Sequence, residues 1–98
     1  MRQVMVRYKV KPDRVEENEE LVRAVYDELA SVAPAGLQYA TYRLEDGVSF
    51  VHLATQSDDG PSPLTKLDAF QRFVANIRDR CDEPPATTEL HRIGSYRV

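Results

Sequence analysis

The sequence contains one cysteine, no tryptophan and no long apolar run, and each of these absences excludes a class of protein or site. The single cysteine, Cys81, permits neither an internal disulfide nor a cysteine-based metal motif. No apolar run approaches the roughly 20 residues of a membrane-spanning helix, and the first residues read as a strand instead of a signal peptide. We therefore expect a cytoplasmic protein that does not bind a membrane.

The chain also lacks a large excess of charge of either sign. Its 13 Lys and Arg residues and 16 Asp and Glu residues give a formal net charge of −3, which offers no basic surface for nucleic acid. The sequence has no Gly-rich phosphate loop, nucleophile elbow, zinc motif or dinucleotide fingerprint, so we expect no metal and no cofactor. Its 98 residues suffice for a single domain, residues 1–98, with one core.

The strongest local signal lies in the middle of the chain, where residues 37–54 predict two strands joined at Asp46-Gly47. This dipeptide favours a two-residue type I′ turn, because both central positions need a positive φ, which Gly adopts freely and Asp tolerates. Such a turn fixes the register of the two strands and pairs Thr41 with His52.

The predicted register assigns the side chains of this hairpin to two faces. One face carries Tyr39, Thr41, Arg43, Phe50, His52 and Ala54. The other face carries Ala40, Tyr42, Leu44, Ser49, Val51 and Leu53. Neither face is polar enough for a sheet surface in water, so we expect helices over one face and a second subunit over the other.

The segment before the hairpin predicts a strand and a helix. Residues 4–10 alternate between apolar and polar side chains with a period of two, as in a half-buried strand, and Pro12 ends this pattern. Asp13 and Glu16 predict a capping box for a helix that ends at about Val32. The apolar stripe of this helix contains Val15, Asn18, Val22, Val25, Leu29 and Val32.

The segment after the hairpin predicts a second helix and a last strand. The helix begins at Ser62-Pro63, a suitable cap and first-turn pair, and ends near Cys81. Its predicted buried stripe is Leu64, Leu67, Phe70, Val74 and Ile77, with Phe73 beside it. Strand-forming residues in 87–98 predict the last strand, with a bulge or bend at Gly94.

The predicted order of elements is strand, helix, strand, strand, helix, strand. It indicates an α+β protein of the ferredoxin-like βαββαβ class, with a four-stranded antiparallel sheet and both helices on one face. The uncovered face favours sheet-to-sheet packing of two copies, so we expect a homodimer.

Five segments carry a resemblance to a known family: residues 6–12, 36–43, 50–53, 69–73 and 94–97. In these segments the chain resembles the antibiotic biosynthesis monooxygenase-like proteins of the dimeric α+β barrel superfamily. The resemblance implies two ferredoxin-like subunits packed sheet against sheet into a barrel, with a pocket between the sheet and the helices of each subunit. It also implies an oxidoreductase, a cofactor-independent monooxygenase that acts on a small phenolic or polyketide-like aromatic molecule.

Haem degradation, the other activity of characterised members of that family, is disfavoured by the sequence. Those members use an asparagine on the first strand, a tryptophan, and a histidine in the second helix. This chain has no tryptophan, places the apolar Val6 at the position of the asparagine, and has no histidine in its predicted second helix.

Three residues on one predicted hairpin face form the candidate catalytic set: His52, Tyr39 and Arg43. A histidine that titrates near neutrality can act as a general base toward a phenol, and Arg43 can stabilise the resulting phenolate. The alternative is a structural role, in which His52 forms a hydrogen bond across the sheet or the dimer interface.

Further aromatic residues are candidates for the wall of a binding pocket for a small aromatic ligand: Tyr8, Tyr42, Phe50, Phe70 and Phe73. Core packing is the alternative for all of them, because aromatic residues at strand and helix spacing fill the volume between layers. The corresponding alternative function is a non-catalytic dimeric small-molecule-binding or stress-associated module with the same fold.

Overall fold

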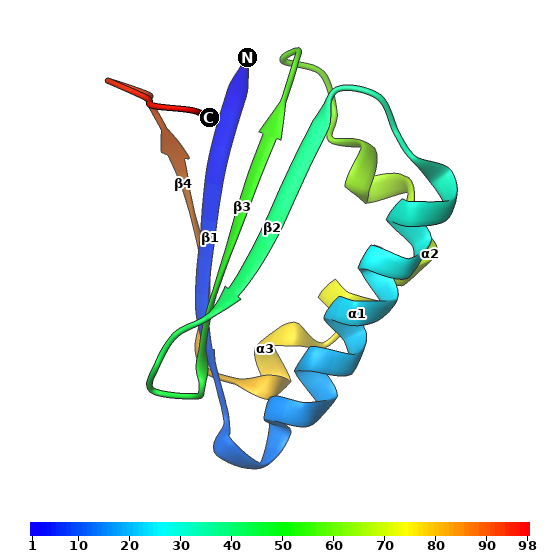
Figure 1. Cartoon of the computed structure of the whole chain (residues 1–98). Coiled ribbons are helices and arrows are strands. Elements are labelled where there is room, and N and C mark those ends of the chain that lie inside the picture. Colours follow the sequence, from blue (N-terminus) through cyan, green and yellow to red (C-terminus); the bar gives the residue numbers. More distant parts are fainter.

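The computed structural model describes all 98 residues and contains one four-stranded antiparallel sheet with its helices on one face (Figure 1). The elements are β1 (Arg2–Val10), α1 (Val15–Val32), β2 (Leu37–Arg43), β3 (Ser49–Gln56), α2 (Asp68–Val74), α3 (Ile77–Arg80) and β4 (Cys81–Leu90). The strand order is β2-β3-β1-β4. The prediction of a ferredoxin-like α+β fold is therefore confirmed.

The β2–β3 hairpin has the predicted register but a different turn. Thr41 pairs with His52, as expected, whereas the connection is longer than two residues and only Gly47, with φ of 80°, has a positive φ. The Asp46 carboxylate instead accepts hydrogen bonds from the backbone N–H groups of Val48 at 3.0 Å and Ser49 at 2.8 Å. The type I′ prediction is wrong because this side chain closes the loop. A hydrogen bond from the Ser49 hydroxyl, followed by the two backbone bonds, lowers the pKa of Asp46 to about 2.

Helix α1 ends where the sequence predicts but begins differently. A 3₁₀ turn over Pro12–Arg14 precedes it, and no side chain caps its N-terminus, so the predicted capping box at Asp13 is wrong. The helix ends at Val32, and the next residue, Ala33, takes a left-handed conformation with φ of 47°. The Ala33 N–H donates to the Leu29 carbonyl at 2.8 Å, which satisfies one of the last carbonyls of the helix.

The predicted second helix is broken into a 3₁₀ turn (Pro63–Lys66), α2 and α3. Ala75 is extended and Asn76 is left-handed with φ of 59°, so the helix stops after Val74. The break changes the buried face: Phe73 is 4% exposed, whereas Val74, which the sequence assigns to the buried stripe, is 43% exposed. The buried Arg80 side chain stabilises this break by donating to the backbone carbonyls of Phe73 and Ala75.

The N-terminus of α2 is held by a side chain from α1. Glu28 accepts hydrogen bonds from the backbone N–H groups of Ala69 at 2.7 Å and Asp68 at 3.3 Å. These two donors have no partner within their own helix, and a carboxylate also complements the positive end of the helix dipole. Glu28 therefore fixes the position of α2 relative to α1.

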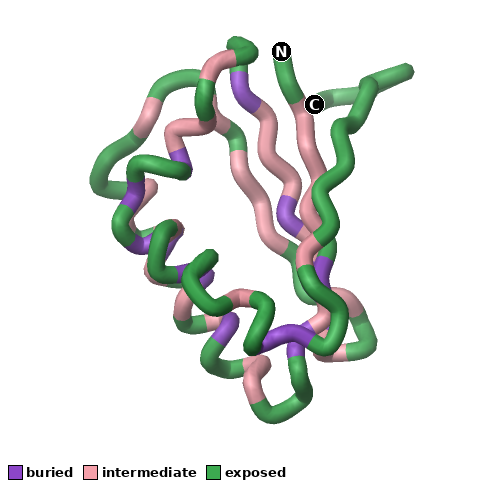
Figure 2. The backbone as a smooth tube through the Cα atoms, turned by 180° about the vertical axis from the view of Figure 1, so that it is seen from behind, coloured by how far each residue is buried: buried purple, intermediate pink, exposed green.

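The last strand lies earlier in the chain than predicted. Strand β4 contains Pro84 and Pro85 and pairs with β1, whereas residues 91–98 have no regular structure and turn back, so that the C-terminus lies near the start of β1 (Figure 1). The prediction of a strand over 87–98 is correct only for its first residues. Prolines are tolerated in β4 because it is at the edge of the sheet. The sequence alone does not show that this segment is an edge strand. Most of its residues are exposed (Figure 2).

The main core lies between the sheet and the helices. It contains the buried side chains of Tyr8, Val10, Val22, Val25, Phe50, Leu64, Leu67, Ala69, Phe73 and Cys81. The hairpin face that carries Phe50 and His52 therefore faces the helices. The opposite face of the sheet carries Met5, Ala40, Tyr42, Val51 and Leu53. None of the helices is long and apolar enough to cross a membrane.

Candidate functional site

His52 lies at the centre of a hydrogen-bond network on the helix-facing side of the sheet. It is 3% exposed, and its register on β3 places it between β1 and β2. Its Nε2 atom lies 2.8 Å from the Tyr8 hydroxyl, while its Nδ1 atom lies 2.8 Å from the Tyr39 hydroxyl and 2.9 Å from Thr41 Oγ1. Both ring nitrogens therefore have partners within the protein.

Helix α1 extends this network at both ends. Asn18 Nδ2 donates to the Tyr8 hydroxyl at 2.9 Å, and Asn18 is fully buried. At the other end, the Tyr26 hydroxyl lies 2.8 Å from Thr41 Oγ1, and the Tyr26 ring stacks on that of Tyr39. The network thus runs without interruption from one position on α1, across three strands, to another position on α1.

Burial determines the charge of the site. It lowers the pKa of His52 to about 4, because the imidazolium form loses its hydration, and it raises the pKa of both Tyr8 and Tyr39. At neutral pH all three side chains are therefore uncharged. The prediction that His52 titrates near neutrality is wrong, since the sequence does not show how deeply this residue is buried.

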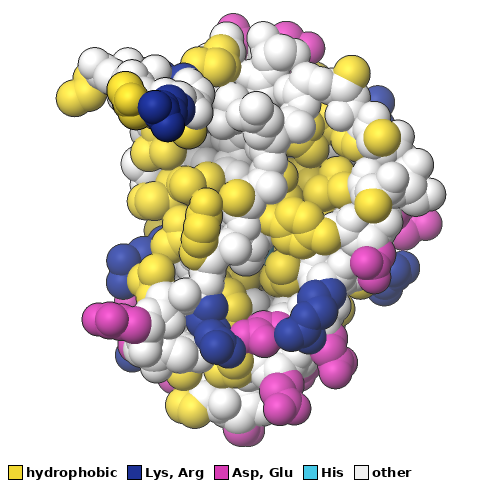
Figure 3. All heavy atoms as spheres, in the orientation of Figure 1, with side chains coloured by type: hydrophobic (Ala, Val, Ile, Leu, Met, Phe, Trp, Pro, Cys, Tyr) yellow, Lys and Arg dark blue, Asp and Glu magenta, His cyan; other side chains and the backbone are white.

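A cavity of about 430 Å³ borders this network, between the sheet and the segment from Ser62 to Arg78. Its lining is largely apolar: Val4, Val6, Tyr8, Tyr39, Ala54, Leu64, Phe70, Phe73, Val74, Ile77 and Pro85, together with His52, Gln56, Ser62, Thr87, Arg2 and Arg78. Figure 3 shows hydrophobic side chains gathered between the sheet and the helices. Such a lining, with a few convergent polar groups, is typical of sites for small molecules.

The charged residues at this cavity are all basic. Arg2 and Arg78 contribute to its lining, and no carboxylate does. Arg2 also forms an ion pair with Glu89, at 3.2 Å, whereas Arg78 is exposed. The charges at the cavity therefore favour an electron-rich or anionic ligand over a cation.

The structure brings together most, but not all, of the predicted site residues. His52, Tyr39, Tyr8, Phe70 and Phe73 all line the cavity. The other three predicted residues, Arg43, Phe50 and Tyr42, do not line it.

Arg43, Phe50 and Tyr42 lie outside the cavity. The Arg43 guanidinium forms an ion pair with Glu19 at 2.6 Å, on the surface. Phe50 is a core residue whose ring stacks on that of Tyr8, with centroids 5.6 Å apart. Tyr42 is on the opposite face of the sheet and is 54% exposed.

Sequence reasoning missed Asn18 and Arg78 as site residues. Asn18 does stand in the apolar stripe of the first helix, and a polar residue at a core position indicates a buried hydrogen bond. No comparable signal identifies Arg78, because the break after Val74 decides which side of the second helical segment faces the cavity.

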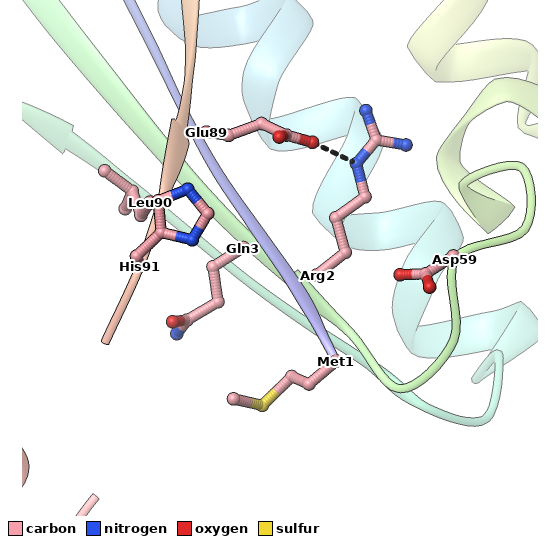
Figure 4. Close-up of a pocket in the computed structure, with 7 residues that line it drawn as sticks. All are labelled: Met1, Arg2, Gln3, Asp59, Glu89, Leu90 and His91. Carbon is pink, nitrogen blue, oxygen red and sulfur yellow. Dashed lines mark ion pairs between the residues drawn. The ribbon is translucent and has the colours of Figure 1, made fainter. Parts of the chain in front are cut away.

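A second depression lies where β1, β4 and the loop after β3 meet. It is lined by Met1, Arg2, Gln3, Asp59, Glu89, Leu90 and His91 (Figure 4). These side chains are mostly exposed, and the Arg2–Glu89 ion pair crosses the depression. No group of three or more His, Cys, Asp or Glu side chains in the chain is arranged to hold a metal ion. The buried network therefore distinguishes the cavity as the better candidate.

Comparison with known proteins supports the fold. No protein-family profile matches the sequence, and no curated protein matches it either. Solved structures do match. A provisionally assigned antibiotic biosynthesis monooxygenase from Nitrosomonas europaea has a TM-score of 0.80 and 16% identity, over 96% of this chain and 100% of that one.

Two further solved structures match this chain with similar TM-scores and identities. A provisionally assigned antibiotic biosynthesis monooxygenase from Caulobacter crescentus has a TM-score of 0.73 and 21% identity, over 95% of this chain and 90% of that one. A protein of unknown function from Nitrosomonas europaea has a TM-score of 0.75 and 15% identity, over 99% of this chain and 93% of that one. This chain therefore has the fold of the antibiotic biosynthesis monooxygenase-like proteins, as its sequence resemblance implies.

Proposed function

We propose that this protein is a cofactor-independent monooxygenase that acts on a small phenolic molecule bound in the cavity beside His52. The observation that carries this proposal is the Tyr8–His52–Tyr39 group, which places polar atoms at the wall of a mainly apolar cavity. A planar aromatic ring suits the Phe70 and Phe73 side of such a cavity, and a ring oxygen suits the tyrosine side.

The proposed chemistry balances without a further reductant. Oxidation of a phenol to a quinone by one O₂ inserts one oxygen atom into the ring and releases the other as water. The substrate supplies all four electrons and two of its hydrogen atoms. The protein has to bind the phenol, favour its ionised form and exclude bulk water, which are tasks for hydrogen-bonding groups in a largely apolar cavity.

A second candidate, a non-catalytic binding module, is favoured by one observation. The imidazole of His52 has a pKa of about 4 and both of its nitrogens are occupied, so it is a weak base toward a phenol at neutral pH. In that case the same cavity holds a small aromatic molecule without converting it.

Incubation with 1-naphthol under ¹⁸O₂ tests the first candidate. We expect 1,4-naphthoquinone that carries one labelled oxygen atom, with one labelled water formed per turnover. Tyr39→Phe removes a hydroxyl at the cavity and is expected to lower the rate roughly tenfold or more, whereas Tyr42→Phe, on the other face of the sheet, leaves it unchanged. Binding of 1-naphthol without oxygen uptake supports the second candidate, and absence of binding contradicts both.

We also propose that two copies pack sheet against sheet into a homodimer. Met5, Ala40, Tyr42, Val51 and Leu53 supply an apolar surface on the face of the sheet that the helices leave free. A contiguous apolar surface of this kind is typical of an interface. The proposal also agrees with the barrel that the family resemblance implies.

A further inference from the structure

The short contacts at His52 Nδ1 determine which nitrogen carries the proton. Two hydroxyl oxygens, of Tyr39 and Thr41, lie within 2.9 Å of this one atom. A deprotonated Nδ1 has a single lone pair and accepts only one of these hydrogen bonds, which leaves the other oxygen in repulsive contact. An N–H at Nδ1 serves both oxygens as a shared donor, so the contacts favour the Nδ1–H tautomer of the neutral imidazole.

The contacts at Nε2 agree with this assignment. An unprotonated Nε2 accepts from the Tyr8 hydroxyl at 2.8 Å, and the Tyr8 oxygen in turn accepts from Asn18 Nδ2 at 2.9 Å. In this direction Asn18 Oδ1 is the buried oxygen that is left without a partner. The opposite direction, with the amide turned over, leaves buried N–H groups without a partner instead, and proteins tolerate that less often than an unpaired carbonyl.

The direction of the network leaves one donor unused. The Tyr39 oxygen accepts from His52 Nδ1–H at 2.8 Å. Burial raises the Tyr39 pKa, and an interaction with the Thr41 side chain lowers it, as a donor to the Tyr39 oxygen does. Since both Tyr39 and His52 line the cavity, the proton of this hydroxyl is available to a molecule bound there. The site therefore presents a donor, and the lining adds the two guanidinium groups of Arg2 and Arg78 and no carboxylate.

We propose that the Tyr39 hydroxyl is the specificity-determining donor of the cavity, and that the cavity selects ligands that present an oxygen able to accept a hydrogen bond from it. Asn18 and Tyr8 act as positioning residues, because they hold His52 in the tautomer that orients Tyr39. The inference rests on the proposed function for the ligand site alone. It also gives His52 a different role, since the histidine orients a donor and removes no proton.

The tautomer is measurable without any ligand. Two-bond ¹H–¹⁵N correlation spectra distinguish Nδ1–H from Nε2–H imidazoles, and the chain has only one other histidine, the exposed His91, which a His91→Gln variant assigns. We expect the Nδ1–H pattern for His52 at neutral pH. An Nε2–H pattern overturns the inference, whatever the protein binds.

The selectivity is measurable with 4-nitrophenol, whose neutral and ionised forms absorb at different wavelengths. Burial raises the pKa of a phenol in this site, as it does for Tyr8 and Tyr39, so the readout is the change that the Tyr39 donor makes to the bound pKa. Tyr39→Phe raises the bound pKa by roughly one unit or more, since it removes a hydrogen bond to a charged oxygen. Tyr42→Phe, on the opposite face of the sheet, is the matched control and leaves the value unchanged.

The two measurements separate failure of the inference from failure of the proposed function. A bound pKa that does not respond to Tyr39→Phe overturns the inference and leaves the ligand site intact. Absence of 4-nitrophenol binding contradicts the proposed phenol site, and the spectra of His52 still decide the tautomer. Nδ1–H spectra together with a bound pKa that rises in Tyr39→Phe support both parts.

Discussion

The buried histidine gives the folding stability of this protein a defined dependence on pH. In the folded chain burial lowers the pKa of His52 to about 4 from the ordinary value of 6.5, so the unfolded state binds a proton more readily than the folded state. Stability is therefore complete above about pH 6.5 and decreases as the pH falls through the window down to about pH 4. The size of the pKa shift corresponds to about 3 kcal/mol of unfolding free energy.

Urea denaturation followed by far-ultraviolet circular dichroism, at several pH values between about 7.5 and 4.5, measures this dependence. His52→Gln keeps a polar side chain of similar size but does not titrate, so its stability is expected to change much less across the window. His91→Gln, at an exposed position, is expected to behave like the wild type. Asp46, whose pKa is lowered to about 2, loses its favourable ionised interactions only at lower pH and does not obscure the result.

An equal loss of unfolding free energy by the wild type and His52→Gln between pH 6.5 and pH 4.5 refutes a lowered pKa for His52. That result means that His52 takes up a proton in the folded state as easily as in the unfolded one. The cavity beside it is then filled by water that hydrates the imidazolium, and the account of a dry, neutral site is incorrect.

Two further predictions concern the sheet and the hairpin loop. Leu53→Glu places a charge on the outer face of the sheet and is expected to convert the dimer to a folded monomer, as measured by sedimentation velocity. Val32→Glu, at an exposed position on α1, is the control and leaves the protein a dimer. A monomeric wild type contradicts the proposal. Gly47→Ala is expected to cost about 1 kcal/mol in urea denaturation, because φ of 80° strains the backbone although the added methyl group meets no neighbour. Gly94→Ala, which also has free space and no positive φ, is the control, and an equal cost at both positions contradicts the role of φ.

The second helix is the element in which the structure differs most clearly from the prediction. Its apolar positions predict one continuous helix with Val74 in the core, whereas the chain breaks there and buries Phe73 instead. The ends of α2 depend on specific side-chain contacts: Glu28, far away on α1, holds its start, and the Arg80 side chain donates to the carbonyls of Phe73 and Ala75 at its end. Local periodicity contains no information on such contacts, so the sequence alone does not predict the break.

The sequence by itself determined the order of the elements, the register of the hairpin and the set of residues that share a face with His52. These follow from local rules: side chains alternate between the two faces of a strand, a helix repeats about every 3.6 residues, and each step along one hairpin strand is matched by one step along the other. None of these rules depends on the rest of the chain. Only the tertiary structure decided that the His52 face meets the helices, that the Tyr8 hydroxyl reaches the imidazole of His52, and that Asn18 reaches the Tyr8 hydroxyl. It also decided the charge of that imidazole, because desolvation depends on everything that packs around a group and on no single neighbour in the sequence.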